Sequence, residues 1–459
     1  MTKIDSKKLK PIPCLGVLKL LKYVIPSIQN VLPTGVKMHH ENGDIINVKL
    51  SGKSNMIMVN HPDYVQHILK TDPDNYSRKK VIGSLSGLLG DGLFNSEGAL
   101  WEQQHQLIKP TLHEKLVSDY YDVIHEETDI LIKNWDQKAK TQKNVDIEYD
   151  INVMMLKILI RTQLSPSATV DFKEIIKSLR VFIKQSNPLN FVIRKSINET
   201  LAFFKLPLLK NKKSIAALKH LDQLINSIRT EAKKNPENIG LVLKTLEDAY
   251  RKNMISDKQV NDEIKNFFFA GFDTTATALT WTLFCYAKHK KQAQVLQTEI
   301  LEVLKNNPPR YEQMNDLPYN KMFIQESLRL YPPVFLIPRM SLAQDDLNGY
   351  NLPKKNWIGI NVYALHRHPK FWKKPEDFDP MRFERGNFKG KAFAYIPFGQ
   401  GKRMCIGKAL AMTELQVILP RIVQHFNLEL VDEKEPVISP DIIIKSRKKL
   451  LMKLTPKQF

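Results

Sequence analysis

The stretch FGQGKRMCIG, residues 398–407, constrains this chain more than any other part of its sequence. It places Cys405 in a loop with three glycines, an aromatic residue at its start and an arginine two positions before the cysteine. Glycine lets the backbone turn sharply and approach a flat group closely. An aromatic ring excludes water from a sulfur atom, and backbone amides that point at a thiolate tune the iron it binds. These residues therefore suit a cysteine thiolate that is the axial ligand of a heme iron.

The residues after Cys405, IGKALAMTELQVILPRIV, have the pattern of a helix whose positive N-terminal end would lie beside the thiolate. The alternative for a lone cysteine is a buried free thiol in a loop before a helix. The pattern F-x-x-G-x-R-x-C-x-G fixes five positions, and a chance match to all of them is rare. The stretch resembles the heme-binding signature of the cytochrome P450 superfamily.

The chain has 459 residues, and no serine- and glycine-rich linker, internal repeat or low-complexity run divides it. We therefore expect a single heme domain over residues 1–459, with an N-terminal extension and amphipathic helix over 1–40 and no fused reductase. Three cysteines are too few and too scattered for a disulfide framework or a zinc site, which predicts a reducing compartment and a cytoplasmic location.

The apolar segment GVLKLLKYVIPSIQNVL, residues 16–32, contains Lys19, Lys22 and Pro26. It is too short and too charged to cross a bilayer, so we expect at most a peripheral membrane contact. The net charge is +21, but the basic residues are not clustered on a nucleic-acid reading motif, and we expect no nucleic-acid partner. An acidic protein partner explains part of the excess more economically.

Apolar periodicity predicts a hairpin of strands at 45–50 and 55–59, and a helix from 99 to about 138. The longest helical pattern covers about 257–288, and its second half is apolar on all faces, which is typical of a helix that crosses the interior. Short strands and turns occupy 334–403, and the tail after the last helix reads as strand pairs. Further helices are expected at about 147–164, 171–186, 212–234, 290–305 and 318–330. The predicted fold class is mainly α with a smaller β portion (α+β).

A second block, FIQESLRLYPPV, carries Glu326 and Arg329 three residues apart, on one face of a helix. Such pairs are usually solvated surface pairs that contribute little. Some fifty residues later, PEDFDPMRF contains Arg382. The resemblance implies that Glu326, Arg329 and Arg382 form a buried ion triad beneath the heme, which would fix the cysteine loop.

A third block, AGFDTT, residues 270–275, lies within the longest helical pattern. Gly271 weakens a helix, Asp273 is costly to bury, and a threonine can bond back to the carbonyl four residues earlier and bend the helix. A kinked packing helix is the alternative. The resemblance implies that Thr274 opens a groove for O2 and hydrogen-bonds the iron-bound oxygen, and that Asp273 relays protons. Ala270 occupies the position where members with covalent heme carry glutamate, so the resemblance implies non-covalent heme b.

A fourth block, WEQQHQL, carries Trp101 and His105 on one helix face. The resemblance implies that both contact a heme propionate, although His105 departs from the usual arginine. Arg339 and Arg403 match other propionate positions, and the guanidinium fork suits carboxylates. The full cofactor-binding set implied is Trp101, His105, Ala270, Arg339, Phe398, Arg403 and Gly407, with Cys405 as iron ligand.

The resemblance implies a soluble bacterial-type monooxygenase that inserts one oxygen of O2 into a C–H bond of a small lipophilic substrate. The layout of LLGDGLF and of PLLKNKKSIAALKHL resembles the fatty-acid and alkyl hydroxylase branches. Electrons from NAD(P)H would come through a separate acidic ferredoxin or flavodoxin and its reductase, docking over Lys402, Arg403 and Lys408. We expect a monomer. The expected pocket combines segment 183–210 with Phe94, Ala270, Val334, Phe335 and Leu336.

Three alternatives stay open. The first is oxidative O-demethylation of a small ether or a methylated sugar. The second is a peroxide-driven or isomerising enzyme without an external reductant, against which the Asp273–Thr274 pair argues. The third is a non-catalytic heme-binding sensor. Substrate-dependent NAD(P)H consumption with a redox partner separates the monooxygenase from the last two.

Overall fold

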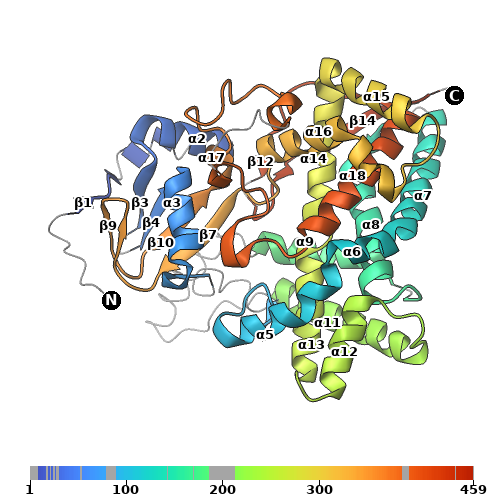
Figure 1. Ribbon diagram of the computed structural model, residues 1–459, viewed down its shortest axis with the longest axis horizontal. Coiled ribbons are helices and arrows are strands. Elements are labelled where there is room, and N and C mark those ends of the chain that lie inside the picture. The colour runs from blue at the N-terminus through green and yellow to red at the C-terminus, as the bar shows by residue number, and fades with distance from the viewer. Residues whose placement is uncertain are drawn as a thin grey trace. The chain divides into compact units, whose positions relative to one another are not determined.

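The structure is a computed structural model. It describes residues 9–16, 19, 20, 22, 23, 26, 30–51, 54–78, 89–141, 143–168, 170–185, 212–384, 392–439 and 441–457. The chain forms two compact units. The first comprises Met1–Val81, Trp135–Asp146 and Thr277–Phe459, and the second comprises Ile82–Asn134 and Ile147–Ala276. Helices predominate over several small sheets, which confirms the predicted fold class (Figure 1).

The largest sheet of the first unit has six strands in the order β2–β3–β4–β10–β7–β5. Strands β3 and β4 form the predicted hairpin, and β10 joins β4 in parallel and β7 antiparallel. Ile57 and Val59 pair with Ile358 and Ile360, and all four are at most 1% exposed. Burial of such side chains stabilises by about 1.5–3 kcal/mol each. The strands are Cys14–Leu15, Ile45–Ser51, Ser54–Val59, Trp357–Asn361, Leu336–Ser341 and Tyr76–Ser77.

Among the described residues the first unit also has three smaller sheets, and the two that contain strands of the tail confirm the strand pairs expected there. One has the order β1–β9–β8, the second β11–β14–β6, and the third pairs β12 with β13. The bounds are β1 Lys10–Pro11, β6 Val145–Asp146, β8 Asp345–Leu347, β9 Tyr350–Leu352, β11 Phe426–Leu430, β12 Ile438–Ser439, β13 Lys445–Ser446 and β14 Leu451–Pro456.

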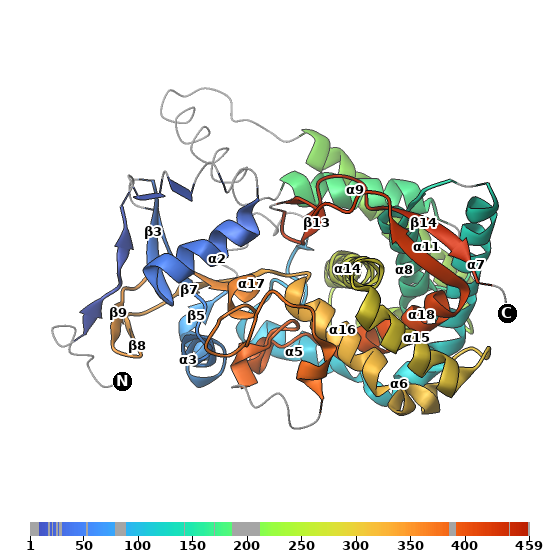
Figure 2. The ribbon, with the colours of Figure 1, turned by 90° about the horizontal axis from the view of Figure 1, so that it is seen from above.

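The helices of the first unit include a cluster of α15 (Lys290–Leu304), α16 (Pro318–Leu330) and α18 (Lys408–His425), which lie side by side (Figures 1 and 2). All three match predicted helices. Pro318 begins α16, where its fixed φ favours the first turn. Near the large sheet lie α2 (Val31–Asn42), α3 (Pro62–Gln66), the π-turn η1 (His67–Thr71) and α17 (Val362–Leu365).

The second unit contains α5 (Gly98–Ile108), α6 (Glu114–Val117), α8 (Ile147–Leu159), α9 (Phe172–Gln185), α11 (Lys212–Lys234), α12 (Leu241–Arg251) and α13 (Asp257–Ala270). Two helices, α7 (Tyr121–Lys140) and α14 (Asp273–Lys288), have residues in both units. The sequence reading predicted α8, α9 and α11 but missed α12, which follows Gly240.

The helical pattern predicted from 99 to about 138 is present but is divided into several helices. The chain forms α5, a 3-10 turn from Lys109 to Leu112, α6, a second 3-10 turn and α7. Pro110 cannot donate a helical hydrogen bond, and His113 has extended backbone with φ −69° and ψ 142°. His113 accepts the N–H of Lys115 at Nδ1, and so caps α6.

The helix predicted over 257–288 is interrupted, because α13 ends at Ala270 and α14 begins at Asp273. Thr274 Oγ1 donates to the carbonyl oxygen of Ala270 at 2.8 Å, the back-bonding expected at this bend. A Cβ at Gly271 would lie 2.7 Å from both Leu159 Cδ1 of α8 and the Phe267 carbonyl oxygen, so a larger residue here would require the chain to shift. Ser256 accepts the N–H of Gln259 and caps α13.

Over the part of the chain that the structure describes, no helix is both long and apolar enough to span a membrane. In the N-terminal segment predicted as an amphipathic helix, residues 17, 18, 21, 24, 25 and 27–29 lie outside the described residues.

Candidate active site

The Cys405 loop is held by its own backbone. Gly399 and Gly401 have φ of +68° and +73°, which glycine adopts without strain. The N–H of Cys405 donates to the carbonyl oxygen of Phe398 at 2.8 Å, so the two ends of the loop meet. A Cβ at Gly401 would collide with the carbonyl oxygen of Leu69, which places the π-turn η1 directly against the loop.

The thiol of Cys405 has the surroundings of a thiolate ligand. The residue is exposed, and helix α18 begins three residues later, at Lys408. Desolvation raises the pKa of the thiol, while the backbone N–H of Gly407 and the charges of Arg78 and Lys408 act in the opposite direction. An amide donor, a helix N-terminus and two cations all favour negative charge on sulfur. This donor set fits a thiolate ligand of a heme iron.

The structure brings Glu326, Arg329 and Arg382 together. The side chains of Glu326 and Arg329 are fully buried and form a bidentate pair, with Arg329 Nε and Nη2 at 2.7 and 2.8 Å from the two carboxylate oxygens. Arg382 Nε lies 3.3 Å from Glu326 Oε1, which also accepts the N–H of Asp379 at 2.8 Å. The carboxylate is therefore fully satisfied inside the protein.

The guanidinium of Arg329 uses its remaining donors on three backbone carbonyls. These belong to His366, Pro375 and Asp377, at 2.9, 2.7 and 3.0 Å. Arg329 also lies over the ring of Trp372, with 5.1 Å between the guanidinium carbon and the ring centroid. A charge with five donors satisfied in this way is stable in the interior, and it ties α16 to the segment 366–377.

His366 was missed by the sequence reading. It is fully buried, and burial lowers the pKa of its imidazole to about 3. Its ring bonds the carbonyl of Arg329 on one side and the N–H of Ile396 on the other. Ile396 in turn accepts the N–H of Gly399 at 3.0 Å. This chain of bonds runs from the ion triad to the Cys405 loop.

The other predicted residues of the first unit lie either on or beside β7 or in the Cys405 loop. Arg339 is 6% exposed and donates to the carbonyl oxygen of Pro338 at 2.8 Å. Val334, Phe335 and Leu336 are half-buried, and the Phe335 carbonyl accepts the N–H of Val362 at 2.9 Å. Arg403 and Phe398 are half-buried in the Cys405 loop.

In the second unit, Trp101 and His105 share one face of α5 as predicted. Their rings stack with centroids 4.7 Å apart, and Trp101 is 7% exposed. The stack holds the His105 imidazole against the indole.

Phe94 belongs to a loop that is fastened to α13 by three side chains that the sequence reading missed. Asp262 accepts the N–H of Asp91, Glu263 that of Leu93 and Asn266 that of Phe94, at 2.8–3.1 Å. The Phe94 ring meets Phe269 edge to face, with centroids 5.4 Å apart. Burial raises the pKa of Glu263 to about 8, so this carboxyl is neutral at pH 7.

Ala270, Asp273 and Thr274 lie where α13 gives way to α14. Asp273 is 5% exposed, whereas Ala270 is exposed and Thr274 half-buried. Ala270 and Thr274 therefore lie on the open side of this bend, and Asp273 on the closed side. Of the expected pocket segment 183–210, residues 186–210 lie outside the described part of the chain.

Comparisons with known proteins agree with these observations. The cytochrome P450 family model matches residues 7–454. Cyclooctatin synthase of Streptomyces melanosporofaciens is 29% identical over 84% of this chain and 83% of its own length. Cytochrome P450 4A12B of Mus musculus is 28% identical over 85% of this chain and 79% of its own. Cytochrome P450 4F8 of Homo sapiens is 28% identical over 86% of this chain and 80% of its own length. The chain therefore belongs to the cytochrome P450 family, whose members are heme-iron monooxygenases that oxidise small molecules with O2 and with NAD(P)H-derived electrons delivered by a redox partner.

Proposed function

We propose that this chain is a single-domain monooxygenase in which Cys405 is the axial iron ligand of non-covalently bound heme b, and that it hydroxylates a lipophilic substrate. The observation that supports this proposal most strongly is the exposed cysteine in its loop. A hydrogen bond from the Cys405 N–H to the Phe398 carbonyl closes the loop, and the Gly407 N–H is directed at the sulfur. Bound heme supplies the activation of O2. As a thiolate, Cys405 would bind the iron and donate electron density to it.

The absorption spectrum of the dithionite-reduced holoprotein under carbon monoxide tests the ligand. We expect a strongly red-shifted Soret band in the wild type and its loss in Cys405→Ser. Cys14→Ser is the matched control, because Cys14 is also an exposed free cysteine of the first unit. A band typical of histidine ligation, or the same band in Cys405→Ser, contradicts the assignment.

Four polar side chains would hold the heme propionates. Arg339 and Arg403 offer guanidinium forks, which pair with carboxylates bidentately. Trp101 offers an indole N–H and His105 a ring N–H. Phe398 shields the sulfur from water, and Ala270 leaves no carboxylate for a covalent bond to the heme. These roles rest on the family resemblance.

Asp273 and Thr274 would deliver protons from solvent to the active site. The Thr274 hydroxyl hydrogen is directed to the Ala270 carbonyl, which leaves the Oγ1 lone pairs able to accept a proton donor. The adjacent Asp273 carboxyl is buried and would pass protons toward Oγ1 from solvent.

The proposed substrate is a fatty acid, a terpenoid or a similar lipophile. The edge-to-face pair of Phe94 and Phe269 and the half-buried Val334, Phe335 and Leu336 are apolar groups of the kind that line small-molecule sites. A screen of such compounds by the spin-state shift of the bound heme tests the class. A response confined to methyl ethers would favour O-demethylation instead.

The proposed electron donor is an acidic ferredoxin or flavodoxin that docks on Lys402 and Lys408. Both side chains are exposed, and they lie three residues before and three residues after Cys405 in the sequence. Steering by such charges weakens with ionic strength. Electron transfer that is insensitive to salt and to Lys402→Glu would contradict this surface. We also propose a monomer in the cytoplasm, which sedimentation and cell fractionation check.

A further inference from the structure

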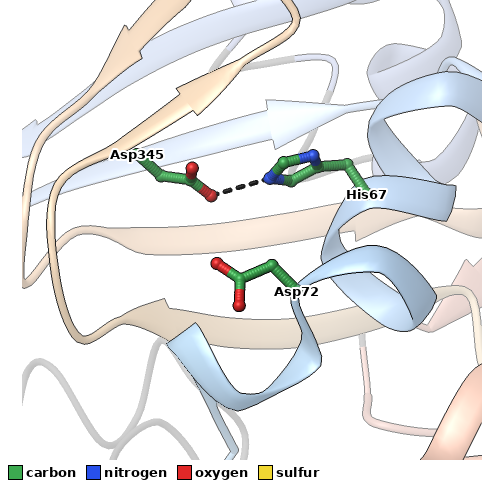
Figure 3. Close-up of side chains that lie close together, drawn as sticks. All are labelled: His67, Asp72 and Asp345. Carbon is green, nitrogen blue, oxygen red and sulfur yellow. Dashed lines mark hydrogen bonds and ion pairs between the residues drawn. The ribbon is translucent and has the colours of Figure 1, made fainter. Parts of the chain in front are cut away.

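Three possible metal ligands converge in the first unit, apart from the Cys405 thiol. His67 Nε2 lies 2.8 Å from Asp345 Oδ2, and Asp72 directs its carboxylate toward the same pair (Figure 3). The ligand atoms of all three residues lie within 4.8 Å of one another. His67 is the first residue of the π-turn η1, and Asp72 directly follows it. Asp345 is the first residue of β8, far away in sequence.

The π-turn is what brings His67 and Asp72 together. Residues five apart on an α-helix point in different directions, because each residue rotates the chain by about 100°. Here the N–H of Asp72 donates to the carbonyl of His67 at 3.0 Å, the five-residue bond that defines a π-turn. This wider turn aligns the two side chains, and such turns are frequent at functional sites.

The surroundings favour a cation over a simple ion pair. The groups that influence Asp72 are Asp345, His67, Asp74 and Asn75, so its main charged neighbours are two carboxylates and one imidazole. A divalent ion would balance the two converging carboxylates, Asp72 and Asp345.

The ligand set also has a supporting hydrogen bond. Tyr76 donates from its hydroxyl to Asp345 Oδ2 at 2.5 Å and thereby orients that carboxylate. Ligating carboxylates in metal sites are usually hydrogen-bonded in this way. One imidazole and two carboxylates suit zinc and similar divalent transition metals, with ligand bonds of roughly 2.0–2.2 Å.

We propose that His67, Asp72 and Asp345 bind one divalent transition-metal ion, which fastens the π-turn η1 to strand β8. The consequence reaches the cysteine loop, because the Leu69 carbonyl at the centre of the turn packs against Gly401. A metal at this position would hold one wall of the loop that carries Cys405.

Isothermal titration of the untagged, chelator-treated holoprotein with zinc chloride tests the site. Asp72→Asn removes one ligand charge but keeps the His67–Asp345 and Tyr76–Asp345 bonds, so the fold is retained. His67→Gln keeps a donor to Asp345 but loses the imidazole. Asp74→Asn is the matched control, because its side chain is 86% exposed on the same segment.

We expect one zinc per wild-type chain and per Asp74→Asn chain, with a rise in melting temperature on binding. Affinity should fall by about tenfold or more in Asp72→Asn and in His67→Gln, with the thermal shift lost. Absence of saturable binding to the wild type overturns the proposal. Zinc binding that persists unchanged in both cluster variants also overturns it, because the ion then lies elsewhere.

Discussion

His366 accepts a hydrogen bond of 2.9 Å at Nε2 from the backbone N–H of Ile396, two residues before Phe398. Its Nδ1 lies 3.1 Å from the Arg329 carbonyl, which can only accept, so Nδ1 carries the proton. The imidazole is therefore neutral, in one defined tautomer, and a second proton would break the bond to Ile396. A neutral buried histidine thus joins the charged triad to the loop of the iron ligand.

The neutral state of His366 makes stability depend on pH. Burial lowers its pKa from 6.5 to about 3, so the unfolded chain binds a proton more readily than the folded one. The contribution of His366 is fully present above pH 6.5 and is lost as the pH falls toward 3, at about 1.4 kcal/mol per pH unit. In His366→Gln, which keeps a donor and an acceptor, this part of the loss should vanish.

Urea unfolding of the wild type and of His366→Gln between pH 7.5 and 5 checks this. His40→Gln, at an exposed histidine, should follow the wild type. Parallel pH curves for the wild type and His366→Gln would show that the histidine is not held neutral.

We expect the protein to lose much of its stability when the carboxylate of the triad is removed. Glu326→Gln leaves the buried Arg329 guanidinium without its counter-charge, which should cost about 3–5 kcal/mol of unfolding free energy. Glu174→Gln breaks a Lys177 pair of 2.9 Å, also three residues apart, in which both side chains are exposed (43% and 69%), and it should cost under about 1 kcal/mol. Chemical denaturation of both variants measures the contrast, and equal losses would mean that burial does not govern the triad.

Two glycines of the cysteine loop should respond differently to alanine. Both have positive φ, which costs an alanine about 1–2 kcal/mol. Only at Gly401 would the new Cβ also meet the Leu69 carbonyl, whereas Gly399 has open space around it. We expect Gly399→Ala to retain most of its heme and Gly401→Ala to lose most of it, as measured by the ratio of Soret to protein absorbance. Equal heme content in both variants would contradict the close contact.

The sequence predicted features that lie within one element and missed those that depend on tertiary contact. Glu326 and Arg329 could be paired because three residues on a helix define one face. The hydrogen bond from the Leu93 N–H to Glu263 joins residues 170 apart, so no periodic pattern in the sequence indicates it. Apolar periodicity also continued through Pro110, where the missing N–H ends the helix. The cysteine loop was readable because thiolate ligation requires several residue types at fixed offsets.

Glu263 should make the second unit less stable in alkali. Burial raises its pKa from 4.5 to about 8, so its contribution is fully present below pH 4.5 and is lost as the pH rises through 8. The slope is about 1.4 kcal/mol per pH unit. Glu263→Gln keeps an acceptor for the Leu93 N–H and cannot ionise. Urea unfolding at pH 6 and 8.5 should show a smaller loss in this variant than in the wild type, and equal losses would contradict a neutral Glu263.

Thr274 supplies the sharpest test of the proposed proton delivery. Its hydroxyl donates to the Ala270 carbonyl, and the remaining lone pairs of Oγ1 are available to a proton donor. Thr274→Ala removes this group while alanine favours the helix, so the fold should be retained. With a redox partner and a substrate, NAD(P)H consumption should persist, but product per NAD(P)H should fall by roughly tenfold or more, with hydrogen peroxide as the other product.

Two variants separate this role from helix structure. Thr274→Ser keeps the hydroxyl and should recover most of the coupling between NAD(P)H and product. Thr298→Ala removes an exposed threonine of α15 that makes the same back-bond, at 3.1 Å to the Gln294 carbonyl, and should leave coupling unchanged. If Thr274→Ala stays fully coupled, proton delivery does not pass through Oγ1. If Thr274→Ser is as uncoupled as alanine, the methyl group rather than the hydroxyl is what the site requires.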